Sequence, residues 1–138
     1  MTTTTEQTGV SVEENVADGG NRLVHRTSFT DTTLTVHLEG EVDLESTPLI
    51  GRYLQEAHQE AQLRGAKEVA LDLTQLQFVN SSGIKHFVNW LRDASRLAPE
   101  IAYNIRILSS PLIPWQRRSL GALRCFAPNI LTIDEQKS

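Results

Sequence analysis

The junction after residues 69–79 constrains the fold more than any other feature of the chain. VALDL (69–73) is a nearly continuous apolar run, as expected of a strand that is buried on both faces. The strand pattern continues to Val79, and Asn80-Ser81-Ser82-Gly83 follows it directly. Beyond these four residues an amphipathic helix is indicated, because apolar side chains recur at i, i+3, i+4 and i+7, at Ile84, Phe87, Val88 and Leu91. A buried strand joined directly to such a helix predicts an α/β domain with this strand at the centre of its sheet.

Two shorter alternating segments precede this junction. LVHRTSF (23–29) and LTVHLEGEV (34–42) alternate around turn residues, which predicts a hairpin of two strands. Ser46-Thr47-Pro48 then supplies cap residues and a proline suited to the first turn of a helix. The helical face that follows ends near Gly65, a residue type common just beyond helix C-termini.

Strand and helix patterns continue to alternate after the junction. IAYNIRIL (101–108) predicts a strand, the segment from SSPLIP (109–114) to Leu123 a short helix, and NILTI (129–133) a last strand. The predicted order is β-β-α-β-α-β-α-β. Strands separated by helices favour a mixed, mostly parallel β-sheet packed against helices, with the opening hairpin adding an antiparallel pair.

Residues 1–22 differ in composition from the rest of the chain. They are Thr-rich and acidic and hold few large apolar side chains, so burial cannot offset the entropy of ordering them. We expect a flexible tail over 1–22, a single domain over 23–134 and a short C-terminal tail over 135–138. Four of the 17 acidic residues lie before Arg22, which leaves 13 acidic and 13 basic residues in the remainder.

The charge balance and the apolar segments argue against several classes of protein. A neutral body without a basic stripe argues against nucleic-acid binding, because neutralising phosphates requires clustered Lys and Arg. No segment approaches the roughly 18 apolar residues of a membrane-spanning helix, and the first residues lack the pattern of a secretory signal. We therefore expect a cytoplasmic protein that contacts neither nucleic acid nor a membrane.

The cysteine and the histidines offer no metal or catalytic centre. The single Cys125 excludes an internal disulfide, and we expect it to be a small buried apolar residue. None of the four histidines has metal-ligand spacing to another histidine or to the cysteine. We expect no metal and no other cofactor. The histidines are His25, His37, His58 and His86.

Two interpretations of the Asn80-Ser81-Ser82-Gly83 junction remain open. Asn80 or Ser81 can cap the helix, which is an ordinary structural role for these residues. Two adjacent hydroxyls followed by a glycine also form a site that the active cleft of another protein could approach. A phosphate at this position would destabilise the fold less than one elsewhere, because a helix N-terminus favours negative charge.

Three segments carry a resemblance to a known family. They are LEGEVD (38–43), VALDLTQLQFVNSSGIKHF (69–87) and the strand-helix-strand remainder to Asp134. Over roughly residues 23–134 the chain resembles a STAS domain of the bacterial anti-sigma factor antagonist type. The resemblance implies a protein partner, a serine kinase and anti-sigma factor with the ATP-binding histidine-kinase-like fold. It also implies release of that partner when the kinase phosphorylates a serine, and reversal by a PP2C-type phosphatase.

Matched by motif, the family's functional positions fall on the junction and on the strand before the first helix. The phosphate acceptor is Ser81, with Ser82 as the less favoured neighbour, and Asp43 matches the aspartate of the family's G-E-L-D segment. The family aspartate before the serine is Asn80 here, so one carboxylate is missing. The predicted partner-binding residues are Asp43, Asn80, Ser81, Ser82, Gly83, Lys85 and His86.

Other interpretations stay beside this one. Asn80 favours a STAS module that is not phosphorylated and serves as a scaffold or ligand-binding subunit of a larger complex. An enzyme is not expected: Ser81 and His86 are five residues apart on one helix and point apart, and no G-x-S-x-G motif is present. Trp90 and Trp115 fit either packing or an interface. An extended strand would place four carboxylates on one side, as a solvated strand end or a docking surface: Glu39, Glu41, Asp43 and Glu45.

Overall fold

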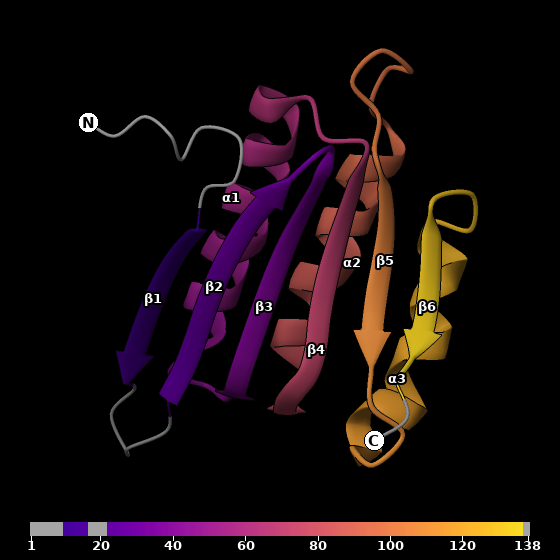
Figure 1. Ribbon diagram of the computed structural model, residues 1–138. Coiled ribbons are helices and arrows are strands. Elements are labelled where there is room, and N and C mark those ends of the chain that lie inside the picture. Colours follow the sequence, from indigo (N-terminus) through magenta and orange to yellow (C-terminus); the bar gives the residue numbers. More distant parts are fainter. Residues whose placement is uncertain (1–9, 17–21, 137–138) are drawn as a thin grey trace.

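The computed structural model describes residues 10–16 and 22–136, which form one sheet with helices against it (Figure 1). In the described part of the chain the six strands follow one another in sequence order across the sheet. The elements are β1 (Val10–Val16), β2 (Arg22–Thr30), β3 (Thr33–Val42), α1 (Thr47–Arg64), β4 (Glu68–Val79), α2 (Ser81–Ser95), β5 (Asn104–Ser109), α3 (Pro114–Leu123), the short 3-10 helix η2 (Arg124–Phe126) and β6 (Leu131–Glu135).

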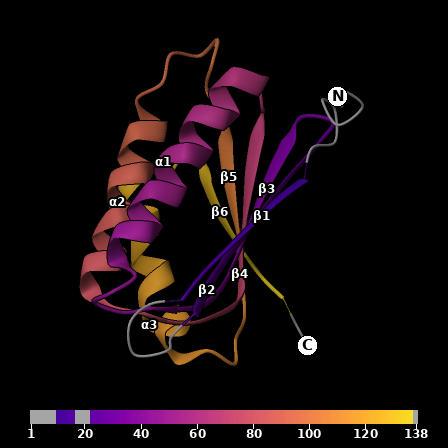
Figure 2. The same cartoon turned by 90° about the vertical axis from the view of Figure 1, so that its left-hand side faces the viewer.

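The pairing of the strands confirms the predicted mixed sheet. β1–β2 and β2–β3 are antiparallel, and the pairs β3–β4, β4–β5 and β5–β6 are parallel. Each parallel connection contains one helix, and crossovers of this kind are almost always right-handed. Because the strands advance in one direction across the sheet, α1, α2 and α3 all lie on the same face (Figure 2). From β2 onward the predicted element order is confirmed.

The ends of α1 follow the predicted signals. Ser46 occupies the N-cap position, although its hydroxyl bonds to the preceding loop and not to the helix, and a proline lies in the first turn. At the other end Gly65 adopts a left-handed conformation with φ 66°, and its N–H bonds to carbonyls of the last turn. Glycine adopts this conformation without the steric cost that a side chain would bring.

The core lies between the sheet and the three helices. In β3 the inward positions Leu34, Val36 and Leu38 are buried, while the residues between them are partly accessible. The run 69–73 of β4 lies in the middle of the sheet, as predicted. Trp90 and Trp115 are both buried and donate hydrogen bonds inside the domain, so both are packing residues.

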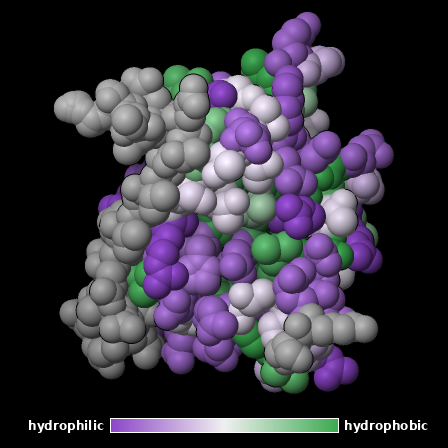
Figure 3. All heavy atoms as spheres, in the orientation of Figure 1, coloured by the Kyte–Doolittle hydropathy of each residue, from purple (hydrophilic) through white to green (hydrophobic). Residues whose placement is uncertain are grey.

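The other face of the sheet carries no helix, and hydrophilic side chains cover much of it (Figure 3). Arg106 on β5 lies near carboxylates of both neighbouring strands, 3.3 Å from Glu68 and 3.7 Å from Asp134. His37 on β3 is 3.2 Å from both Asp72 and Glu39. This face is therefore an ion-paired, solvated surface.

Several details differ from the sequence predictions. Residues 10–16 of the predicted tail form β1, while 1–9 and 17–21 lie outside the described residues. Cys125 is exposed, because η2 follows α3 at the rim of the domain and does not enter the core. The four alternating carboxylates do not form one row. β3 is irregular on both sides of Glu39 and ends at Val42, so Asp43 and Glu45 belong to the loop before α1.

Candidate functional site

Asn80 forms the junction between β4 and α2. It is the N-cap residue of α2, with an extended backbone, and its side-chain oxygen accepts a hydrogen bond of 2.8 Å from the N–H of Gly83. Its own N–H donates to the carbonyl of Val42, at the end of the neighbouring strand β3. Of the two caps that the sequence allowed, Asn80 is the one used. Its bonds fix the start of α2 against the carboxyl end of the sheet.

A threonine of α1 explains why an amide suits position 80. The Thr47 hydroxyl lies 2.7 Å from the carbonyl of Asp43 and 3.2 Å from the Asn80 side-chain oxygen, and it can donate its one proton to either. The Asn80 amide nitrogen donates to the same hydroxyl oxygen at 3.0 Å. A carboxylate at position 80 could accept from Gly83 and from the Thr47 hydroxyl, but it could not donate to Thr47 as the amide does. The amide at position 80, where the family motif has a carboxylate, is therefore compatible with the local hydrogen bonding.

Asp43 shapes the loop between β3 and α1. One carboxylate oxygen accepts hydrogen bonds from the N–H groups of Glu45 and Ser46, both at 3.1 Å, and from the Ser46 hydroxyl at 3.0 Å. The Ser46 hydroxyl is in turn 2.9 Å from the N–H of Asp43. Through Thr47 this loop is tied to Asn80, so the structure brings the Asp43 loop and the start of α2 together at one edge of the sheet.

The two serines and the glycine of the junction face different environments. Ser81 and Ser82 are exposed, whereas Gly83 is buried. A Cβ atom at Gly83 would lie 2.7 Å from Cγ1 of Val79 and 3.0 Å from Cγ1 of Val42. The close approach that this glycine permits is thus between α2 and the strands beneath it.

Lys85 and His86 lie one turn further along α2. The Lys85 side chain is exposed. His86 is partly buried because its ring lies against α1: a Cβ atom at Gly51 would come within 2.7 Å of the imidazole Cε1. Of the seven predicted partner-binding residues, Ser81, Ser82 and Lys85 are the fully exposed ones.

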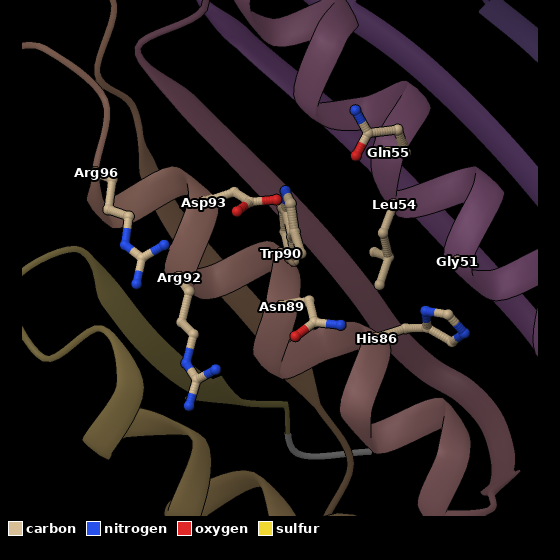
Figure 4. A pocket seen from close by; sticks show the side chains of 9 residues that line it. All are labelled: Gly51, Leu54, Gln55, His86, Asn89, Trp90, Arg92, Asp93 and Arg96. Carbon is tan, nitrogen blue, oxygen red and sulfur yellow. The ribbon is translucent and has the colours of Figure 1, made fainter.

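A groove of about 400 Å³ between α1 and α2 was not predicted from the sequence (Figure 4). Its wall on α2 includes His86, Asn89 and Trp90, and its wall on α1 includes Gly51 and Gln55. The groove forms where α1 and α2 lie side by side. Because these helices are separated in the sequence, no local sequence pattern predicts it. Glycine at position 51 is the one signal in the sequence, because it allows the close contact with His86.

A polar chain lies beneath this groove. The Trp90 indole N–H donates to the Tyr103 hydroxyl at 3.0 Å, and that oxygen is 2.7 Å from Nδ1 of His58 on α1. Burial lowers the pKa of His58, although the Asp93 carboxylate acts in the opposite direction. The lowered pKa favours the neutral imidazole, which can accept the proton of the tyrosine hydroxyl at Nδ1.

The described residues include no cluster of histidine, cysteine and acidic side chains that could hold a metal ion. Within the same part of the chain, no helix is long and apolar enough to cross a membrane. What the site offers is an exposed pair of hydroxyls at the start of a helix, beside a loop fixed by hydrogen bonds.

The fold and this junction define a small α/β domain with all its described α-helices on one side of the sheet. Residues 25–104 match the family model described as "Mlab, STAS domain", so the chain belongs to the STAS family. The resemblance inferred from the sequence is confirmed. None of the curated protein sequences matches this chain.

Two solved structures have the same fold. An anti-sigma factor antagonist from Mycobacterium paratuberculosis is 17% identical, with a TM-score of 0.54 over 88% of this chain and 85% of that chain. The anti-sigma factor antagonist SpoIIAA in its unphosphorylated form is also 17% identical, with a TM-score of 0.50 over 83% of this chain and 88% of that one.

Proposed function

We propose that this protein is a non-enzymatic, cytoplasmic regulator that binds a protein partner when Ser81 is unmodified and releases it when Ser81 is phosphorylated. The partner would be a serine kinase and anti-sigma factor of the histidine-kinase-like fold, and a PP2C-type phosphatase would restore binding. The similarity to two anti-sigma factor antagonists supports this class of partner.

The observation that carries the proposal is the exposure of the Ser81 hydroxyl at the first position of α2. A kinase can reach it without unfolding the domain, because the hydrogen bonds that fix the helix start come from Asn80 and leave the serine free of that task. The N-terminus of a helix also tolerates negative charge. Phosphorylation would therefore change the surface while the fold stays intact.

Release follows from electrostatics at the contact. A phosphoserine adds about 1.5 to 2 negative charges at neutral pH. Burying such a charge in an interface without a matched partner is costly. The Asp43 loop, joined to the start of α2 through Thr47 and Asn80, would form part of the same contact surface.

A constitutive function is the second candidate, and one observation favours it. The amide of Asn80 is matched to Thr47, so the site works as a purely structural cap without a carboxylate beside the serine. In that case the domain would serve as a permanent subunit or ligand-binding component of a larger complex, and Ser81 would never carry a phosphate.

Mass spectrometry of the protein isolated from its native cells distinguishes the two functions. We expect a phosphate on Ser81 that disappears on phosphatase treatment. We also expect Ser81→Ala to retain the partners that co-purify with the native protein and Ser81→Asp to lose them. Ser82→Asp is the matched control, since it adds the same charge to the neighbouring exposed serine.

An unmodified Ser81 under every growth condition, together with unchanged binding in Ser81→Asp, would establish the constitutive function instead. Equal loss of partners in the Ser81→Asp and Ser82→Asp variants would show a general sensitivity of the surface to charge and would argue against a specific switch at Ser81.

A further inference from the structure

Charge is distributed unevenly along this chain. The segment 85–124 contains two acidic residues, Asp93 and Glu100, against seven basic ones. The chain as a whole has a formal charge of -4, so this segment has the opposite sign to the rest of the molecule. The seven basic residues are Lys85, Arg92, Arg96, Arg106, Arg117, Arg118 and Arg124.

Three of these residues form a basic stripe on α2. Lys85, Arg92 and Arg96 are seven and four positions apart, so they lie on one face of a helix with about 3.6 residues per turn. All three side chains are exposed. Figure 4 shows the Arg92 and Arg96 side chains beside one another, on the side of α2 away from α1. The sequence interpretation that the body lacks a basic stripe is therefore wrong at this surface.

The positive charge of the stripe is not neutralised inside the domain. Across residues 22–136, no carboxylate lies within salt-bridge distance of Lys85, Arg92 or Arg96. The nearest acidic residue in sequence, Asp93, is turned toward α1, where it acts on His58. Arg106 on the open sheet face is different, because it has two carboxylates beside it.

The stripe is bordered by an aromatic ring and by the groove between α1 and α2. The guanidinium carbon of Arg92 lies over the Phe126 ring, 5.5 Å from the ring centre. Arg92 and Arg96 also line the groove between α1 and α2, together with the amides of Gln55 and Asn89 and the carboxylate of Asp93. At its N-terminal end the stripe begins one turn from Ser81, since Lys85 is four residues further along the helix.

We propose that the basic stripe and the adjoining groove dock an acidic segment of a protein partner. This inference rests on the proposed function, because it names the chemistry of the partner that would contact Ser81. Carboxylates of the partner would pair with Lys85, Arg92 and Arg96, while its polar groups would bond to the amides in the groove. A phosphate on Ser81 would compete with those carboxylates for Lys85, which lies one turn away on the same helix.

A protein suits this surface better than the other anionic partners. Three charges are few for nucleic acid, because Lys and Arg contacts to the phosphate backbone supply essentially all of its sequence-independent affinity. Outside the stripe the molecule is acidic, and an extended anion such as a membrane or a polynucleotide would meet that charge as well, whereas a short acidic segment contacts the stripe alone. The groove also contains two amides, whose hydrogen bonds a flat lipid surface cannot reach.

The test is an NMR titration of the full-length isotope-labelled protein with a short polyglutamate peptide at physiological ionic strength. We expect chemical-shift changes in residues 85–96 and in the groove wall on α1. Arg92→Glu/Arg96→Glu should weaken binding about tenfold, since paired charges become repulsive. The matched control is Arg117→Glu/Arg118→Glu, which makes the same change of net charge at exposed arginines of α3.

Equal weakening by both double variants, or shifts spread over all basic residues, would overturn the proposal, because the binding would then be non-specific. Preferential binding of phosphatidylglycerol vesicles or of single-stranded RNA through the stripe would overturn it in favour of those partners. Concentration-dependent dimerisation that the Arg92→Glu/Arg96→Glu variant abolishes would identify a second copy of the chain as the occupant.

The peptide titration does not require phosphorylation, so the two proposals can fail separately. Specific peptide binding with a permanently unmodified Ser81 would sustain the docking surface and refute the switch. A phosphorylated Ser81 without specific peptide binding would do the reverse.

Discussion

At the scale of single residues, the junction before α2 owes its geometry to what each side chain can donate or accommodate. Asn80 supplies an acceptor for Gly83 and a donor for Thr47, two roles that its amide group fills at once. Gly83 has no side chain, which allows α2 to pack closely against the ends of β3 and β4. The exposed serines are left without a structural task of this kind.

Gly83→Ala should destabilise the domain by about 1–3 kcal/mol, because the added methyl group would overlap the valines at the ends of two strands. Denaturation by urea measures the change in the free energy of unfolding. Gly121→Ala is the matched control within a helix: nothing lies within 4 Å of its Cβ position, so we expect a gain of up to about 1 kcal/mol. A loss of equal size at both sites would contradict the packing explanation.

At the scale of secondary-structure elements, α1 and α2 are joined by a buried polar chain as well as by apolar packing. His58 from α1, Trp90 from α2 and Tyr103 before β5 meet at the tyrosine hydroxyl. A neutral histidine satisfies this arrangement, whereas a protonated one cannot accept the tyrosine proton at Nδ1. The contact between the two helices is therefore coupled to the protonation of His58.

The stability of the domain should fall as the pH drops from about 7 to about 5. The pKa of His58 is lowered in the folded protein, so below its unfolded value of about 6.5 the unfolded chain binds more protons than the folded one. Urea denaturation across this pH range measures the effect, and His58→Gln should flatten the curve. Parallel curves for the two proteins would contradict the assignment.

Asp72, on the open sheet face, affects the stability of the domain in a different pH range from His58. Burial acts to raise the pKa of Asp72, but hydrogen bonds from Thr74 and the neighbouring His37 outweigh it, and the pKa is lowered. The stability that this carboxylate provides is lost only as the pH falls below about 4. The two groups can therefore be separated in one pH series.

At the scale of the whole molecule, the one-sided arrangement of helices and the segregation of charge give the protein distinct surfaces. The open sheet face is ion-paired, whereas α2 carries unpaired positive charge and leads to Ser81. Opposite faces of this kind orient a molecule as it approaches a charged partner.

A chain that begins at Arg22 should fold with the same parallel sheet. Among the residues whose burial the structure describes, the core begins at Leu23, and β1 pairs only at the edge through β2. Circular dichroism and cooperative thermal unfolding test this. A chain that ends at Pro128 is the control and should not fold, since it lacks β6 and the buried Leu131. An unfolded chain from Arg22 onward would make β1 an obligatory part of the domain.

Much of the fold could be predicted because its signals are local. The apolar run 69–73, the cap before α1 and Gly65 after it act over a few residues, and all are found where the patterns indicate. The prediction that Cys125 is buried was wrong. It rested on how often cysteine is buried on average, whereas the exposure of this cysteine depends on the position of η2, which has no buried residues. For Trp90 and Trp115 the sequence allowed either packing in the core or a place at an interface. Their hydrogen bonds to the Tyr103 hydroxyl and the Leu76 carbonyl show that both pack inside the domain.

By itself the sequence determined the order of the elements, the central strand, the family and the position of the exposed serines, because periodicity and capping depend on neighbours along the chain. The spacing of Lys85, Arg92 and Arg96 was also present in the sequence. Only the tertiary structure decided that these charges stay unpaired, that Thr47 meets Asn80, and that α1 and α2 enclose a groove. Those properties depend on which elements pack together, and contacts between distant residues leave no local pattern in the chain.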